Sequence, residues 1–352
     1  MTLAETLKQH ILHNGPLRID HFMQQVTAHY YNKSDPFGSS GDFITAPEIS
    51  QMFGEMLGLW VADCWMQMGS PDAFMLVECG PGRGTLMADA LRATKHIRGF
   101  HKAAQIILLE NSNFLKKQQE KRLEGCHVQW IDFFDHPVIQ SSTKPLLLLA
   151  NEFLDALPIR QMQFHQGEWR ERVIGLDQAG NLQFGLAPAS LLPAPAQGKE
   201  GDIAEISPAQ HSFIQSLCAC LKKQGGAALF IDYGYTQGHG DTLQAMKNHG
   251  YVDVLSHIGE ADLTAHVDFS ALARAAEPCT VFNPLTQSAF LQALGIKERA
   301  AMLIKNATAS QKKAIEAALT RLIAPDQMGT LFKAIVLTSG SIIPAGFSKQ
   351  TL

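Results

Sequence analysis

The sequence predicts an α/β fold in which a parallel sheet is covered by helices on both faces. Short apolar runs alternate along the chain with stretches of helical spacing, an order typical of buried parallel strands joined by helices. The apolar runs are residues 74–78, 105–110, 127–132, 145–152 and 226–234. The first run also leads through three closely spaced glycines into a helical pattern, which indicates a strand-to-helix turn.

Two helices are expected ahead of the sheet, over residues 2–13 and within residues 15–31, with Pro16 near the start of the second. Residues 32–50 are dense in glycine, serine, aspartate and proline and have no periodicity. We interpret this segment as a functional lid, and a plain linker is the alternative. Residues 48–69 predict a strongly apolar helix that packs against the sheet.

The segment between the fourth and fifth strands does not have the pattern of a crossover helix. Residues 158–188 contain period-two stretches and the turn signal DQAGN, which predict a small antiparallel β unit. After the fifth strand, residues 240–268 have loop character. Helices are then expected at about 269–277 and within 283–296, and a last strand within 329–340.

These elements divide the chain into three parts. We expect N-terminal helices and the lid in residues 1–46, and a sheet domain in residues 47–154 and 206–340. Residues 155–205 form a β-rich insertion, which we assign to substrate recognition.

Composition and charge argue against several classes of protein. The chain has 352 residues and a net charge of −4, so it lacks the general basic field that would attract nucleic acid. Its six cysteines have no paired CxxC spacing and no HExxH motif occurs, so we expect reduced thiols and no metal site. The N-terminus lacks a long apolar stretch and no apolar run of about 18 residues occurs. We therefore expect no membrane insertion and a cytoplasmic location.

The glycine-rich turn begins with an acid at the end of the first strand. Glu78, Gly80, Gly82 and Gly84 follow the pattern E-x-G-x-G-x-G. A dinucleotide site would need glycine at the sixth position from Gly80, which is Thr85 here. A carboxylate beside bare backbone can instead accept hydrogen bonds from a cationic amino-acid ligand that approaches closely. This pattern resembles motif I of class I S-adenosylmethionine-dependent methyltransferases, and nicotinamide or flavin binding is the weaker alternative.

Two further acids end the next two strands. Glu110 follows the second strand, where Rossmann-like sheets place the group that binds the ribose hydroxyls. Asp132 ends the third strand, where the resemblance to methyltransferases implies a contact with the adenine amine. A single such acid is as often a helix cap or a solvated charge, but three on successive strands favour cofactor binding. From the lid we add Thr45 to the cofactor-binding residues, in a loop that also contains Asp42, Phe43 and Glu48.

Six segments in order resemble one family, the MidA-like methyltransferases. They are GDFITAPEISQMFGEMLG, ECGPGRGTLMADALRA, LLLANEFLDALPIRQ, FIDYGY, GDTLQA and GEADLTAHVDFSAL, and the resemblance runs from about residue 15 to 340. It implies a class I methyltransferase with a Rossmann-like parallel sheet, N-terminal helices and the inserted antiparallel unit. Members of the family include a mitochondrial complex I assembly factor that methylates an arginine of a core subunit. The resemblance therefore implies a protein arginine methyltransferase, with S-adenosylmethionine as cofactor and a respiratory complex I subunit as a candidate substrate.

The segment NEFLDALP supplies candidate catalytic groups. A guanidinium is a poor nucleophile, and a carboxylate that pairs with two of its nitrogens can orient the third for attack. We assign Glu152 to this clamp, Asn151 to orientation and Asp155 to a second acid, with a capping role as the alternative for Asp155.

Two residues of a later segment are candidates for proton transfer. His266 and Asp268 could orient each other and accept a proton after methyl transfer, whereas Asp268 could equally be a helix N-cap. Asp232 and Tyr233, which end the fifth strand, are candidates for lining the pocket, with packing as the alternative for Tyr233.

Three functional hypotheses remain at this stage. The first is a protein arginine methyltransferase, the second a small-molecule methyltransferase, and the third an assembly chaperone that binds S-adenosylmethionine without turnover. The insertion and the acids at 152 and 155 favour an open acidic groove and hence a protein substrate. The oligomeric state stays open, with a homodimer among the alternatives.

Overall fold

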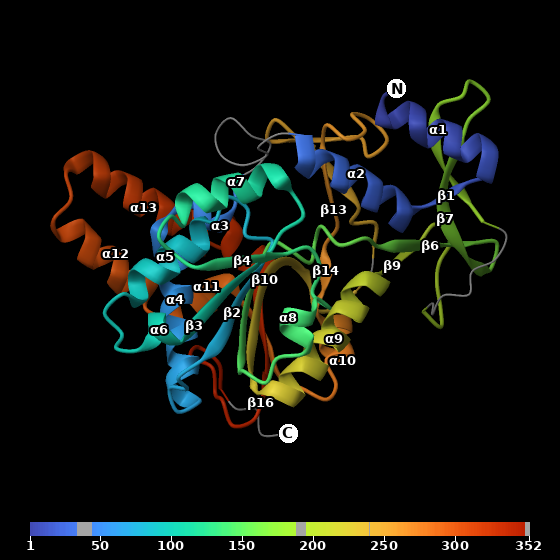
Figure 1. The fold of residues 1–352 in the computed structure, drawn as a ribbon. Helices are drawn as coiled ribbons and strands as arrows, with labels where there is room; N and C mark the ends of the chain where they lie inside the picture. The colour runs from blue at the N-terminus through green and yellow to red at the C-terminus, as the bar shows by residue number, and fades with distance from the viewer. Residues whose placement is uncertain (34–43, 188–194, 239, 349–352) are drawn as a thin grey trace. The chain divides into compact units, whose positions relative to one another are not determined.

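The computed structural model describes residues 1–33, 44–187, 195–238 and 240–348 (Figure 1). The chain forms two compact units, each built from three separated stretches. The first unit comprises Met1–Phe43, Asp155–Ser212 and Gln237–His266. The second unit comprises Ile44–Leu154, Phe213–Thr236 and Val267–Leu352.

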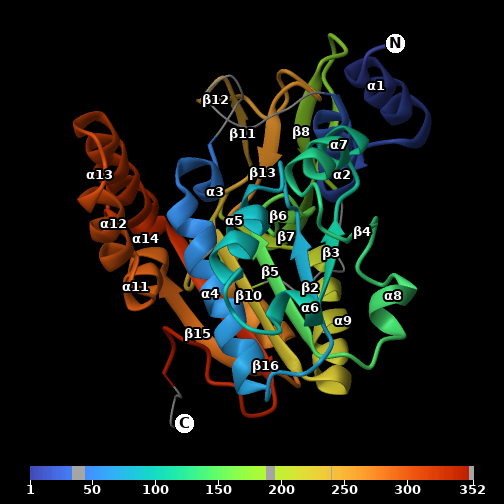
Figure 2. The ribbon, with the colours of Figure 1, turned by 60° about the vertical axis from the view of Figure 1, so that its left-hand side comes forward.

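Within the described residues, the second unit is centred on an eight-stranded sheet (Figures 1 and 2). Its order is β15-β16-β10-β5-β2-β3-β4, with the short β14 paired to β10. Strands β2, β3, β4, β5 and β10 run parallel to one another, which confirms the predicted α/β class. They are β2 Phe74–Cys79, β3 Ala104–Leu109, β4 Val128–Ile131, β5 Leu146–Asn151 and β10 Gly226–Tyr235. All five lie within two residues of the predicted runs.

The sheet is mixed rather than purely parallel. Strand β16 (Phe332–Ser339), which the sequence predicted, pairs antiparallel with β10. Strand β15 (Thr280–Thr286) pairs antiparallel with β16 and was not expected, because residues 283–296 were assigned to a helix. The helix, α11, begins only at Gln287. The register shifts between Phe282 and Leu285, so Pro284 lies at an irregularity in an edge strand, where its missing N–H is tolerated.

Helices cover both faces of this sheet (Figure 2). Helices α4 (Gln51–Gln67) and α5 (Thr85–Thr94) pack on one face, where their apolar side chains join those of alternate strand positions. On the other face lies α9 (Pro208–Gln224), whose Phe213 packs edge-on against Phe230 of β10. The single helix expected over residues 48–69 is in fact two helices, α3 (Ala46–Ile49) and α4. Ser50 separates them, because its extended backbone ends α3 and its hydroxyl accepts the Met52 N–H that starts α4.

The other helices of this unit are shorter or were not expected. They are α6 Phe100–Ala103, α7 Asn113–Arg122, α8 Pro137–Gln140, α10 Phe269–Ala275, α11 Gln287–Ala293, α12 Ile296–Lys305, α13 Ala309–Ile323 and α14 Met328–Leu331; the short strand β14 is Val267–Asp268. The sequence analysis assigned no element to residues 297–328, although a capping box formed by Thr308 and Gln311 starts α13. That pattern is readable in the sequence and would have located the helix.

The first unit combines the N-terminal helices with an antiparallel sheet. Helix α1 (Leu3–Asn14) agrees with the prediction. Helix α2 (Ile19–Lys33) begins later than the expected start near Pro16, because Leu17 and Arg18 pair with β7 as a short strand. The sheet has the order β1-β7-β6-β9, with β8 paired to β7, and every pair is antiparallel, as expected for the insertion. Its strands are β1 Leu17–Arg18, β6 Arg160–His165, β7 Glu168–Leu176, β8 Leu182–Leu186 and β9 Ile203–Ile206.

Residues 240–268 differ from the loop that we expected. They contain a three-stranded sheet with β11 (Gln244–Lys247) between β12 (Gly250–Val252) and β13 (Asp262–Thr264). A two-residue turn of Asn248 and His249, both with positive φ, joins β11 to β12. Asparagine tolerates this conformation, so Asn-His-Gly was the available sequence signal. The strands are too short for the alternation of apolar residues to stand out.

Residues 237–266 belong to the first unit, whereas the sequence analysis placed them in the sheet domain. The reason is packing. Leu243, Ala245 and Leu263 join one buried apolar cluster with side chains of α1 and α2, such as Leu7 and Phe22. Residues 237–266 therefore belong to the first unit because their apolar side chains are buried against distant segments of the chain. Such contacts produce no periodic pattern in the sequence.

Candidate functional site

The glycine turn joins β2 to α5 at the carboxyl edge of the parallel strands. Gly80, Gly82 and Gly84 have φ of 65°, 52° and 77°, a region that favours glycine. At Gly80 an added Cβ would also lie 3.2 Å from the Phe153 ring. The sequence predicted this strand-to-helix turn, and the positive φ values explain why glycine occupies these positions. Gly84 ends the turn as the N-cap of α5.

Glu78 is a buried acid beside this turn. Its side chain is 3% exposed, and burial raises its pKa to about 8. A hydrogen bond from the Met87 backbone N–H opposes this rise, and the charge of Glu110 adds to it. Among the described residues, nothing donates a hydrogen bond to Glu78 Oε2. A buried carboxyl oxygen without a partner is costly, so this atom fits a site that receives a cationic ligand.

Glu110 follows β3 and is also buried, at 8% exposure. It accepts hydrogen bonds from the Ser112 N–H at 2.8 Å and from Gln119 Nε2 at 3.0 Å. Burial raises its pKa, and these two donors oppose the rise. The carboxylate is thus held in one orientation at the end of its strand, where it can bind hydroxyl groups of a ligand.

Gln119 is a residue of the site that the sequence analysis missed. It lies on α7, is fully buried, and connects three elements. Its Nε2 donates to Gly82 O at 2.7 Å as well as to Glu110, and its Oε1 accepts from Trp130 Nε1 at 2.8 Å. A glutamine inside a strongly polar helix gave no signal, because only the fold shows that this one position is buried.

Asp132 lies apart from this buried network. Its side chain is 68% exposed and pairs with Lys116 Nζ at 2.6 Å. An exposed ion pair of this kind exchanges readily with water. The structure therefore leaves Asp132 at the surface at the end of β4.

Asn151 is the last residue of β5, which lies next to β2 in the sheet, and Glu152 follows it. Asn151 is 8% exposed, its Nδ2 donates to Glu152 Oε1 at 3.0 Å, and its Oδ1 has no hydrogen-bond partner among the described residues. Glu152 has φ of 51°, a conformation that non-glycine residues rarely adopt. Its Oε1 also accepts the Ala46 N–H at 3.2 Å. Backbone strain of this kind concentrates at functional sites.

Asp232 lies within β10 and has a structural role in the turn after Glu152. One carboxylate oxygen accepts the N–H groups of Phe153 and Leu154 at 3.2 and 2.9 Å, and the other accepts the Tyr233 N–H at 2.9 Å. Asp232 is 1% exposed and holds the chain that leaves Glu152. Tyr233 packs against Phe332, in agreement with its packing alternative.

The lid residues are described only in part. Asp42 and Phe43 lie outside the described residues. Thr45 is 8% exposed and is the N-cap of α3, although its side chain makes no capping hydrogen bond. Glu48 lies on α3 and accepts hydrogen bonds from Arg83 and Thr85 of the glycine turn and α5.

Asp155 and His266 belong to the first unit. Asp155 is 6% exposed, and its carbonyl accepts the Ala265 N–H at 3.0 Å, so the two segments lie side by side there. The His266 N–H donates to Thr242 Oγ1 at 2.9 Å. Asp268 is the N-cap of α10, with its carboxylate accepting the N–H groups of Ser270 and Ala271 at 2.9 Å, as the capping alternative predicted.

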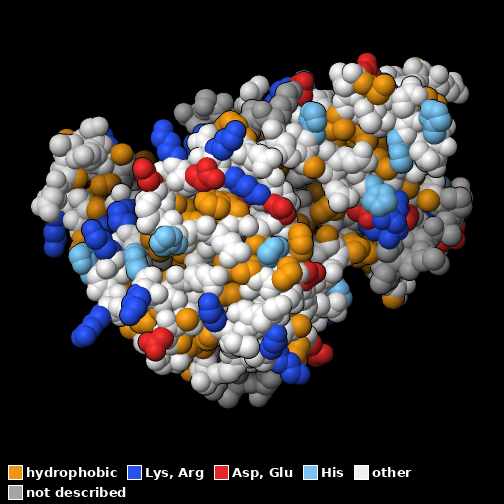
Figure 3. Space-filling view, in the orientation of Figure 1, with side chains coloured by type: hydrophobic (Ala, Val, Ile, Leu, Met, Phe, Trp, Pro, Cys, Tyr) orange, Lys and Arg blue, Asp and Glu red, His pale blue; other side chains and the backbone are white. Residues whose placement is uncertain are grey.

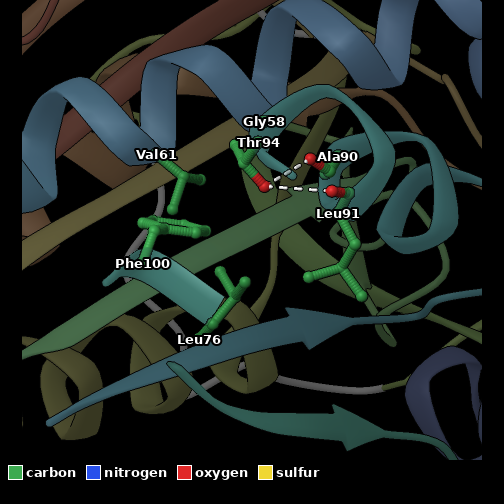
Figure 4. Close-up of a pocket in the computed structure, with 7 residues that line it drawn as sticks. All are labelled: Gly58, Val61, Leu76, Ala90, Leu91, Thr94 and Phe100. Carbon is green, nitrogen blue, oxygen red and sulfur yellow. Dashed lines mark hydrogen bonds between the residues drawn. The ribbon is translucent and has the colours of Figure 1, made fainter. Parts of the chain in front are cut away.

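A small pocket in the second unit is not part of this site. It lies between α4, α5 and β2 and is lined by Gly58, Val61, Leu76, Ala90, Leu91, Thr94 and Phe100 (Figure 4). Its one hydroxyl, on Thr94, already donates to the carbonyls of Ala90 and Leu91. The pocket therefore offers no polar group to a ligand and is a gap in the packing.

Comparison with known proteins identifies the protein family. Residues 56–285 match the model of a family described as "Putative S-adenosyl-L-methionine-dependent methyltransferase". This chain belongs to that methyltransferase family. The methyltransferase is 34% identical over 375 residues to the mitochondrial protein arginine methyltransferase NDUFAF7 homolog of Drosophila melanogaster, covering 96% of this chain and 85% of the relative. It is 35% identical over 359 residues to mitochondrial protein arginine methyltransferase NDUFAF7 of Homo sapiens, covering 92% and 80%.

A solved structure agrees with this assignment. A superfamily member from Burkholderia thailandensis, bound to S-adenosyl-homocysteine, superposes with a TM-score of 0.83 at 26% identity, covering 98% of this chain and 93% of that one. The methyltransferase is therefore an enzyme whose cofactor is S-adenosylmethionine, as the glycine motif predicted. The dinucleotide and the non-catalytic chaperone hypotheses are set aside. Buried carboxyl and amide oxygens without partners at Glu78 and Asn151 fit the positive charges of this cofactor.

One expectation is wrong. We expected a cytoplasmic protein, but the relatives from Drosophila melanogaster, Danio rerio and Homo sapiens are named as mitochondrial. The expectation rested on the lack of a long apolar stretch at the N-terminus and of a long apolar run elsewhere, and neither feature identifies a compartment.

The described residues contain neither a helix suited to span a membrane nor a cluster of metal-binding side chains. No helix in the described ranges is long and apolar enough to cross a membrane. Within the same ranges, no group of three or more histidine, cysteine, aspartate or glutamate side chains could hold a metal ion. On the face shown in Figure 3, basic side chains are interspersed with acidic and hydrophobic ones.

Proposed function

We propose that this methyltransferase methylates an arginine side chain of a protein substrate. The observation that carries the proposal is the similarity to relatives named protein arginine methyltransferases, at 34–35% identity over 92–96% of the chain. Similarity over this length includes the strand ends and the turn that form the candidate site. The acids of that site support the proposal, because a guanidinium is bound best by carboxylates.

The cofactor would lie along the ends of β2, β3 and β4. Glu78 would bind the ammonium group of the cofactor through its unpartnered oxygen, and Glu110 would bind the ribose hydroxyls. Asp132 would contact the adenine amine in exchange for its ion pair with Lys116. Gly80, Gly82 and Gly84 would allow close approach to the turn, with Thr45 at its rim.

Glu152 would orient the guanidinium for attack. The cofactor supplies a methyl group on a sulfonium, a good electrophile, and the reaction moves it to a guanidinium nitrogen with loss of one proton. A carboxylate that pairs with two guanidinium nitrogens holds the positive charge away from the third and fixes its direction. Asn151 Nδ2, at 3.0 Å from Glu152 Oε1, would keep the carboxylate in place. Asp155 and His266 are proposed as a second acid and a proton acceptor.

The identity of the protein substrate is a separate proposal. The family resemblance implies a subunit of respiratory complex I, and we propose such a subunit as the first candidate to test. We also propose that the enzyme forms a homodimer, and sedimentation of the purified chain tests this directly.

The test combines a labelling assay with one substitution. Incubation with labelled S-adenosylmethionine and cell lysate should label a protein at arginine. Glu152→Ala should lower the rate of transfer at least about 100-fold while changing the affinity for S-adenosyl-homocysteine less than about threefold. Glu316→Ala, at an exposed position of α13, is the matched control and should change neither.

Two outcomes would contradict the proposal. A labelled metabolite with no labelled protein would identify a small-molecule methyltransferase. Label on a protein residue other than arginine would exclude the arginine assignment while leaving the cofactor site intact.

A further inference from the structure

Helix α3 contacts Glu152 through its first residue. Ala46 is fully buried, and its N–H donates to Glu152 Oε1 at 3.2 Å. The other N–H groups of this short helix are accounted for, because Pro47 has none and Glu48 and Ile49 donate to Thr45 O at 3.0 and 3.2 Å. The Ala46 N–H is thus the donor that α3 offers to the strand end.

The same helix contacts the glycine turn through its third residue. Glu48 Oε2 accepts from Arg83 Nη1 at 3.2 Å, and Glu48 Oε1 accepts from the Thr85 hydroxyl. The Glu48 side chain is 16% exposed and that of Arg83 20% exposed, so water competes with this pair only in part. Arg83 lies between Gly82 and Gly84, and Thr85 is the first residue of α5. Glu48 therefore holds α3 on the turn that we assign to the cofactor.

We propose that Glu48 is a positioning residue for methyl transfer, because it holds α3 on the glycine turn and α3 in turn orients the Glu152 carboxylate through the Ala46 N–H. The inference rests on the proposed role of Glu152. It also assigns a function to TAPEIS, which is part of one of the six segments that resemble the family.

The geometry indicates how strongly Glu48 should act. Among the described residues, Asn151 Nδ2 at 3.0 Å and the Ala46 N–H at 3.2 Å donate to Glu152 Oε1. Loss of one donor lets the carboxylate rotate away from the direction that in-line transfer requires, and misplacement by about 1 Å can reduce a rate about 100-fold. Helix α3 also packs against α4, α5 and α13, so it should stay folded without Glu48.

The experiment measures Glu48→Ala in three ways. We expect kcat to fall about 10-fold to 100-fold and the affinity for S-adenosyl-homocysteine to change less than about threefold. We also expect hydrogen exchange of the Ala46 amide, followed by NMR, to become at least about 10-fold faster. Thr85→Val, which removes one donor to Glu48, should give smaller changes in the same direction.

The controls separate positioning from loss of structure. Glu316→Ala should leave all three readouts unchanged. If Glu48→Ala does not fold, Glu48→Gln carries the same test, because it keeps the volume and the Thr85 contact but loses the charge that binds Arg83. Equal exchange at Ala46 in the variant and the native protein would overturn the inference, and so would an unchanged kcat.

Failure of the inference can be told apart from failure of the proposed function. If Glu152→Ala slows transfer and Glu48→Ala does not, the role of Glu48 is wrong and that of Glu152 stands. If Glu152→Ala transfers methyl groups at the native rate, the role assigned to Glu152 fails whatever Glu48 does.

Discussion

Gln119 Nε2 donates to Glu110 Oε2 at 3.0 Å, and both side chains are buried. The contact joins α7 to the end of β3, and the same amide also binds the carbonyl of Gly82. One glutamine thus binds both a carboxylate and a turn that we assign to the proposed cofactor site. It makes this residue the first candidate for substitution.

Gln119→Met should weaken cofactor binding and lower stability. It keeps the volume but removes the donor to Glu110 Oε2 and the acceptor of the Trp130 Nε1–H, while the Ser112 N–H still donates to Glu110 Oε1. This loss should cost about 1–3 kcal/mol of the free energy of unfolding. Urea unfolding and titration with S-adenosyl-homocysteine measure the two effects. Gln118→Met, at the neighbouring and more exposed position of α7, is the control. Native affinity in Gln119→Met would show that Glu110 needs no support.

Glu78 should make stability fall as pH rises. The folded protein keeps the Glu78 proton up to a pKa of about 8, whereas an unfolded chain releases it near the ordinary value of 4.5. Between these values the folded state binds more protons than the unfolded state, so the contribution of Glu78 is complete at low pH and is lost as pH approaches 8. Unfolding of the cofactor-free protein and of Glu78→Gln at several pH values should show a steeper decline in the native protein. Parallel curves would contradict the buried, protonated carboxyl.

Cofactor affinity should show the opposite trend in the same pH range. A cation binds the ionised carboxylate, so binding must displace the Glu78 proton and should strengthen as pH rises toward about 8. Glu78→Gln should bind S-adenosyl-homocysteine more weakly and with a flatter pH dependence. Calorimetric titration in buffers of different ionisation enthalpy would detect the released proton. Binding without proton release at pH 7 would exclude this account.

Gly58→Ala should be destabilising. An added Cβ would lie 2.5 Å from Ala90 Cα, where α4 and α5 cross, and backbone cannot move aside as a flexible side chain can. Overpacking of this kind costs about 1–3 kcal/mol. Gly175→Ala in β7, where an added Cβ meets nothing within 4 Å, should change stability by less than about 0.5 kcal/mol. Thermal and urea unfolding compare the pair, and equal stability would mean that the helices can separate.

Asp268→Ala should remove the N-cap of α10. The carboxylate accepts two backbone N–H groups, and loss of such a cap costs about 0.5–2 kcal/mol. Asp268→Asn keeps an acceptor oxygen and should retain most of the stability. A large loss of kcat in Asp268→Asn at near-native stability would instead restore the catalytic alternative.

Local patterns accounted for the parts of the fold that depend on near neighbours. Strand β5 was predictable because a central parallel strand is buried on both faces and is therefore a continuous apolar run. Helix α3 was not predictable as a separate helix, because its end depends on the extended backbone of a single serine, Ser50. Strand β15 contains a proline and was read as a helix start, since its place at the sheet edge could not be known.

Some features of the candidate site were also predictable from the sequence, and others required the fold. The glycine turn that follows Glu78 could be located from the sequence, because the positive φ values of Gly80, Gly82 and Gly84 favour glycine there. The roles of Gln119 and Glu48 required the fold, since the residues they contact lie between 9 and 37 positions away in the chain. Asp132 had the expected place at a strand end but proved to be exposed.

The sequence by itself determined which segments are parallel strands, the glycine turn and the acids that follow the strands, because these depend on burial and backbone conformation that each residue carries locally. Only the tertiary structure decided which polar side chains are buried together, and which unit residues 237–266 join. Those outcomes depend on contacts between distant segments. Such contacts follow from packing of the whole chain and leave no periodic mark on the residues that make them.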